Sequence, residues 1–184
     1  PSSATGIFAR GAVGDGGTVK IKAGSLEVKD GAVITTSARS SGKSGNIDLT
    51  VDELVIAGVG VGNVRAGVLS QSDIGATGVG GRITVNARDL QILNGGQIGV
   101  AALGPGNGGD LIVNAQSVLL SGVQSGLVAR MTASTATSGN AGTINIVTDD
   151  LKVMNGGQIQ AGAFSGSGNG GSITVMADKV LVSG

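Results

Sequence analysis

A short glycine-rich motif recurs six times along this chain of 184 residues. Each copy is a tetrad of the form Gly-x-small-Gly, and the spacings between successive tetrads are 28, 36, 28, 33 and 29 residues. The tetrads occupy residues 14–17, 42–45, 78–81, 106–109, 139–142 and 168–171. Self-similarity at this period is typical of repeat architectures, so it constrains the fold more than any other feature.

Apolar residues stand at fixed offsets after each tetrad. At two, four, six, nine and eleven residues after the last Gly, all six units carry an aliphatic side chain or Ala, with the single exception of Thr148. The first of these columns contains Val19, Ile47, Ile83, Leu111, Ile144 and Ile173. Alternation with a period of two predicts strands with one buried face. In the first complete unit we expect strands at 18–23, 25–30 and 32–38.

Stacking like residues on like residues accounts for these columns. We therefore predict an all-β fold, a right-handed parallel β-helix (solenoid) of about six coils of 28–36 residues, in which residues 1–184 form a single segment. At ~4.8 Å per coil the rod would be roughly 30 Å long. Both ends of the chain cut through a repeat, which predicts a fragment of a longer array.

An antiparallel arrangement is the rival topology. Asp30-Gly31, Asn94-Gly95 and Asn155-Gly156 are hairpin signals of the type I′ class. The equivalent sites of the other units are followed by segments of different length, while the upstream columns stay in register. Coil stacking explains that pattern better than a sandwich of hairpins.

The composition excludes several classes of chemistry. The chain has 36 Gly, no Cys, no His, no Trp, no Tyr and two Phe. Zinc fingers, thiol proteases, Ser-His-Asp triads and His-ligated haem are therefore excluded. The 12 basic residues balance 12 acidic ones, and aromatic stacking platforms are lacking, so we expect no nucleic-acid partner. No apolar run is long enough to span a membrane.

The repeat resembles a known family. The pattern G-N-[AG]-G-x-[IL]-x-[VI]-x-[AT]-x-x-L-x-[VI]-x-x-G-[GA]-x-I is clearest at 139–161, followed by 168–184 and 78–100. It is similar to the repeats of filamentous-haemagglutinin-type exoproteins of the two-partner secretion system, particularly the large exoproteins of cyanobacteria. The resemblance implies secretion through an outer-membrane transporter and a role at the bacterial cell surface as an adhesin or filament.

The charged residues suggest few chemical sites. The tetrads lack the Lys-Ser/Thr of a phosphate loop, and no helix follows them, so we interpret them as corners. The acidic residues near the first corner, such as Asp52 and Asp89, are interrupted by basic ones, so we expect a solvated turn and no metal or cofactor. Lys20 and Asp48 are expected to form an ordinary cross-strand pair, and no convergent acid pair indicates an enzyme.

Three residues are candidates for a ligand-facing edge. Arg10, Gln71 and Arg130 take equivalent positions just after the third strand of the long units, where they would contact an acidic glycan. Surface solubility is the simpler interpretation of the same residues. The variable stretches 59–66 and 132–138 are further candidates for a binding surface, because loops on a rigid scaffold often carry function.

These observations predict a structural shaft segment of a secreted bacterial surface adhesin or extracellular filament. The shaft would display loops or a distal tip for attachment, and copies would associate end to end into filaments. The alternative is a glycan-binding or polysaccharide-degrading β-helix protein. An enzyme of this kind would show one cleft with paired carboxylates.

Overall fold

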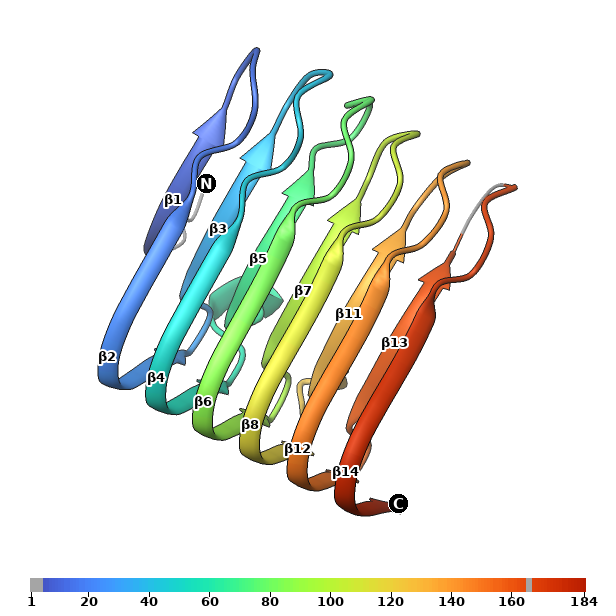
Figure 1. Cartoon of the computed structure of the whole chain (residues 1–184). Coiled ribbons are helices and arrows are strands. Elements are labelled where there is room, and N and C mark those ends of the chain that lie inside the picture. Colours follow the sequence, from blue (N-terminus) through green and yellow to red (C-terminus); the bar gives the residue numbers. More distant parts are fainter. Residues whose placement is uncertain (1–4, 165–166) are drawn as a thin grey trace.

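The computed structural model describes residues 5–164 and 167–184. It is a right-handed parallel β-helix of about six turns, which confirms the predicted fold class (Figure 1). Each turn contains one long and one short strand, and the chain passes from one to the other at two bends. Like strands of successive turns lie side by side along the rod.

The long strands form one six-stranded parallel sheet in the order β2-β4-β6-β8-β12-β14. Their bounds are β2 Val19–Lys29, β4 Ile47–Ala57, β6 Arg82–Leu93, β8 Asp110–Ser121, β12 Thr143–Met154 and β14 Ser172–Ser183. The short strands form a second six-stranded parallel sheet in the order β1-β3-β5-β7-β11-β13. Their bounds are β1 Gly6–Gly11, β3 Val33–Ala38, β5 Gly67–Ser72, β7 Gln97–Ala102, β11 Arg130–Thr135 and β13 Gln158–Ala163.

Two strands per turn replace the three that the sequence predicts. The expected strands 18–23 and 25–30 are joined in β2, which turns a corner without ending (Figure 1). Pairing of β2 with β4 runs from Val19 to Ala23, passes over Gly24 and resumes at Ser25. Because only one residue at the corner is left unpaired, the strand continues on both sides of it. The alternation of apolar residues does not show whether a corner ends a strand, so it did not reveal that the two segments form one strand.

The apolar columns line the interior of the helix as expected. Ile47, Ile83, Leu111 and Ile144 are direct neighbours on successive long strands, and each is 0% exposed. The one polar member of the columns, Thr148, is buried and donates its hydroxyl to the carbonyl oxygen of Gln116 at 3.0 Å. Its inward position is therefore satisfied by a hydrogen bond to the neighbouring coil.

From the second tetrad on, the first and last glycines stack on their equivalents one coil earlier with no room for a side chain. A Cβ on the first Gly of a tetrad would overlap the carbonyl oxygen of the equivalent Gly one coil earlier, as at Gly106 over Gly78. The same holds for the last Gly, as at Gly109 over Gly81. None of these four residues has a positive φ. The close approach of successive coils, and not a left-handed backbone, therefore requires glycine here.

The second residue of the tetrad adds a ladder of side-chain hydrogen bonds. The amide oxygen Oδ1 of Asn107 accepts from the backbone N–H of Asn140 at 2.9 Å, and Oδ1 of Asn140 accepts from that of Asn169 at 3.0 Å. Asp15 accepts in the same way from the N–H of Lys43 at 2.8 Å. Each coil directs a backbone N–H at the coil before it, and an Asn side chain at the second tetrad position accepts this hydrogen bond. This contact accounts for the preference for Asn in the motif.

Two insertions interrupt the otherwise tight turns between long and short strands. Residues 58–66 contain the 3₁₀ helix η1 Val61–Asn63, and residues 122–129 contain the hairpin of β9 Val123–Gln124 and β10 Leu127–Val128. The prediction of a variable loop at 132–138 is wrong for its first half, because residues 132–135 belong to β11 and pair with β7 and β13. In the described part of the chain, no helix is long and apolar enough to cross a membrane.

The stacked glycines give a direct test of the fold. We expect Gly106→Ala to lower stability by about 1–3 kcal/mol or more, because the added methyl group forces two coils apart. A fall of at least about 2 °C in the midpoint of thermal unfolding is the corresponding shift for a chain of this size.

Gly14→Ala is the matched control, because Gly14 stands in the same column but its Cβ would meet nothing within 4 Å. Its midpoint should stay the same or rise slightly, since Ala restricts the unfolded chain. Equal destabilisation by the two substitutions would show that contact between coils is not what selects glycine.

Candidate functional site

A groove lies on the outer face of the short-strand sheet, over β1, β3 and β5. Its volume is about 290 Å³. The lining residues are Phe8, Arg10, Val33, Thr35, Ser37, Arg39, Leu69, Gln71 and Asp73. We call it the β3 groove, since its floor follows that strand.

The groove results from a difference in side-chain size between neighbouring strands. The register places Phe8, Thr35 and Leu69 in one row across the sheet. Thr35 on the middle strand is much shorter than its neighbours, and it is only 8% exposed although it faces outward. The next outward row repeats the pattern, with a short Ser37 between two longer side chains.

Polar groups are placed along both walls. The guanidinium of Arg10 lies over the ring of Phe8, with its Cζ atom 4.4 Å from the ring centroid, which is a cation–π geometry. At the far end, Nε of Arg39 donates to Oδ2 of Asp73 at 3.2 Å. Among the described residues that line the groove, Asp73 is the one carboxylate.

Two of the three predicted edge residues meet in this groove. Arg10 and Gln71 lie on either side of Ser37 in the same row of the sheet. Arg130 does not join them, because it is the first residue of β11 and its neighbours are Gln97 and Gln158. The predicted equivalence of Arg130 with Arg10 is therefore wrong by four residues.

The error arises from the hairpin insertion. The stretch Gly126–Arg130 matches Gly6–Arg10 in residue type, but Gly6 begins β1, whereas Gly126 has a φ of 74° in the turn between β9 and β10. The same Gly-apolar pattern thus serves a strand in one coil and a turn in another. Only the pairing partners distinguish the two.

Arg130 has a different set of contacts. Its Nη2 and Nε atoms donate to Oε1 of Gln97 at 2.7 and 3.1 Å. Burial lowers the pKa of its guanidinium. Arg65, from the insertion 58–66, has a pKa lowered by burial and by the charge of Arg130.

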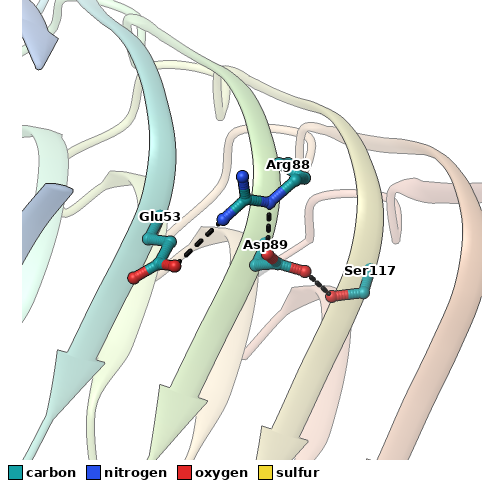
Figure 2. A network of polar contacts seen from close by, with 4 residues as sticks. All are labelled: Glu53, Arg88, Asp89 and Ser117. Carbon is teal, nitrogen blue, oxygen red and sulfur yellow. Dashed lines mark hydrogen bonds and ion pairs between the residues drawn. The ribbon is translucent and has the colours of Figure 1, made fainter. Parts of the chain in front are cut away.

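A network of charged residues covers the corner of the long strands (Figure 2). Arg88 donates to Glu53 on one side at 3.0 Å and to Asp89 on the other at 2.8 Å. Ser117, from the next coil, donates its hydroxyl to Oδ1 of Asp89 at 2.7 Å. We expected the acids at this corner to lie in a solvated turn. These four residues are half-exposed, and they are linked across three coils.

The network explains the titration of its acid. The hydrogen bond from Ser117, followed by that from Arg88, lowers the pKa of Asp89. The hydrogen bond and charge of Asp89 in turn raise the pKa of Arg88.

Within the described residues, no three potential metal ligands among His, Cys, Asp and Glu lie together. Lys20 and Asp48 form the expected cross-strand pair, at 3.9 Å.

Comparison with protein-family models, curated proteins and solved structures gives no match for this chain. The similarity to haemagglutinin-type exoproteins therefore stays a prediction from the repeat pattern.

The lowered pKa of Asp89 predicts a pH-dependent contribution to stability. A folded-state pKa below the unfolded value means that the ionised carboxylate stabilises the fold above the unfolded pKa, and that this contribution is lost as the pH falls through the folded-state pKa. We expect Asp89→Asn to be less stable than the parent at pH 7 by at most about 1 kcal/mol, because the pair is exposed to solvent. The two proteins should converge in acid, once the pH lies below the folded-state pKa of Asp89.

Urea unfolding at both pH values measures this difference. Asp149→Asn is the control, since Asp149 lies at the same corner of β12, is exposed and takes part in no described ion pair. Its substitution should leave the free energy of unfolding unchanged at both pH values. A difference for Asp89→Asn that persisted in acid would rule out the carboxylate charge as its source.

Proposed function

We propose that this chain is a structural shaft segment of a secreted bacterial surface adhesin or extracellular filament. The observation that carries the proposal is the unbroken register of its two six-stranded sheets along the rod. Every coil is joined to its neighbours by parallel backbone hydrogen bonds on both sheets, so the rod resists bending and extension. Such a rod holds what it carries away from the surface to which it is attached.

The position of the variable residues supports this role. The insertions at 58–66 and 122–129 lie outside the two sheets and leave the strand register unchanged on either side. A shaft therefore accepts different loops on different coils without loss of its core. The resemblance of the repeat supplies the rest of the proposal: export through an outer-membrane transporter of the two-partner type and a location at the cell surface.

End-to-end association is part of the same proposal. Val175, Val180 and Val182 on β14 are 37%, 56% and 74% exposed in this chain. A further coil or a second copy that continued both sheets would cover them, as each coil within the chain covers the one before it.

Surface display is the decisive test. An antiserum raised against the folded chain should label intact cells of the native organism, and immunogold electron microscopy should place the label on extended material outside the outer membrane. Disruption of the two-partner transporter should abolish this labelling. Label that appeared only after permeabilisation of the cells would contradict the proposal.

The β3 groove favours a second candidate function, binding of a glycan. An exposed Phe ring beside Arg10, facing Gln71 across a floor of small side chains, offers both an apolar surface and hydrogen-bond donors to a sugar. Arg10 would contact an acidic group of that sugar. A single carboxylate in the groove supports binding and not degradation.

An oligosaccharide that contains uronic acid is the probe for this function. We expect Arg10→Gln to weaken its binding by about tenfold, the effect of losing one charge-assisted hydrogen bond. Arg82→Gln is the control, because Arg82 is a half-exposed arginine of the other sheet, paired with Asp110 at 3.1 Å. Isothermal titration calorimetry that found no binding, or equal losses for both variants, would exclude the groove.

A further inference from the structure

The two insertions lie on either side of one coil, at the same connection between a long and a short strand. Each insertion closes on itself in the same way, with Ala66 N–H donating to Gly58 O and Ala129 N–H donating to Gly122 O, both at 3.0 Å. The coil between them has only the tight turn at residues 94–96. A Cβ on Gly95 would approach Val59 Cγ2 at 2.5 Å and Leu127 O at 3.1 Å, so both insertions reach over this turn.

Arg65 extends across this turn from one insertion to the other. Its Nη1 atom donates to Gly95 O at 2.9 Å and to Val128 O at 2.6 Å. These two bonds hold the planar guanidinium in one orientation. Nε and Nη2 make no hydrogen bond to a described residue, and they remain as donors.

Arg130 and Gln97 add further donors near the same place. Arg130 binds Oε1 of Gln97 through Nε and Nη2, which leaves its Nη1 without a described acceptor. The same bonds occupy the only side-chain acceptor of Gln97, so its Nε2 amide group is left as a donor. The cluster of Arg65, Arg130 and Gln97 thus presents donors and no side-chain acceptor.

The charges of this cluster are not balanced within the described chain. Arg39, Arg82 and Arg88 each pair with a carboxylate, but no ion pair between described residues includes Arg65 or Arg130. Both side chains are half-buried. Burial lowers the pKa of each guanidinium, and the charge of Arg130 lowers that of Arg65 further. Two mutually repelling, partly desolvated cations favour an anion between them.

We propose that Arg65, Arg130 and Gln97 form a binding site for an oxyanion, a carboxylate or sulfate group of a ligand that binds beside this turn. Each arginine offers planar N–H groups of the kind that bind two oxygens at once. The bonds from Arg65 to Gly95 and Val128 orient the site before the ligand arrives, which lowers the entropic cost of binding. The site is separate from the β3 groove and does not depend on the proposed function.

Titration with small anions tests the site directly. Sodium sulfate and sodium acetate are compared with sodium chloride at equal ionic strength, and the Nε–Hε resonances of the arginines are followed by NMR. We expect saturable shifts of the Arg65 and Arg130 signals with sulfate, acetate or both, within about 50 mM, and the stronger of the two identifies the preferred group. Shifts that do not saturate, or that are the same with chloride, would overturn the proposal.

Gln97→Glu provides an internal competitor. A carboxylate at position 97 would accept from Arg130 and supply the missing negative charge, so this variant should lose anion binding by at least about tenfold and unfold at a higher temperature. Gln91→Glu, an outward position on β6 of the other sheet, is the control and should leave anion binding unchanged. Unaltered binding in Gln97→Glu would overturn the proposal.

Arg130→Gln removes one cation with little disturbance, because Gln97 and Gln158 already occupy this position on the adjacent strands. It should weaken anion binding at least about tenfold while the amide spectrum remains that of a folded protein. If Arg65 served only to link the insertions, Arg130→Gln would bind sulfate as the parent does, and the proposal would fall.

Discussion

The close, uniform distance between successive coils is the constraint on which the rest of this structure depends. Parallel backbone hydrogen bonds set that distance at about 4.8 Å at every strand position. Each side chain therefore packs against the residue at the same position one coil away. A residue that differs in size disturbs its equivalents on both adjacent coils. The stacked glycines are the extreme case, because Gly106 lies so close to the carbonyl group of Gly78 that no Cβ fits.

The same constraint separates the parts of a coil that vary from those that do not. Inward positions such as Ile83 and Leu111 contact their equivalents directly, so they keep one chemical type. The turn between long and short strands lies outside the two sheets, and it accepts the insertions 58–66 and 122–129. Outward positions on the strands also vary, and a short Thr35 between Phe8 and Leu69 is enough to create the β3 groove.

Candidate binding features therefore arise from differences between adjacent coils. The β3 groove exists because Thr35 and Ser37 of β3 are smaller than the outward side chains beside them on β1 and β5. The cluster of Arg65, Arg130 and Gln97 forms where a tight turn at Gly95 lies between two longer connections, and Arg65 crosses this turn to reach Val128. The corner network joins Glu53, Arg88 and Ser117 from three successive coils through Asp89. None of these features would form on a perfectly regular array.

The sequence by itself determined the all-β solenoid and its interior, because alternation and stacking are local rules that repeat in every unit. The columns through Ile47 and Thr148 could be predicted on that basis, and so could the cross-strand pair of Lys20 with Asp48. Whether Gly126 begins a strand or a turn was decided only by the tertiary structure, and with it the neighbours of Arg130. Segments 6–10 and 126–130 have the same residue types. They differ physically in the backbone groups of the neighbouring chain with which each one forms hydrogen bonds, and the sequence does not show those partners.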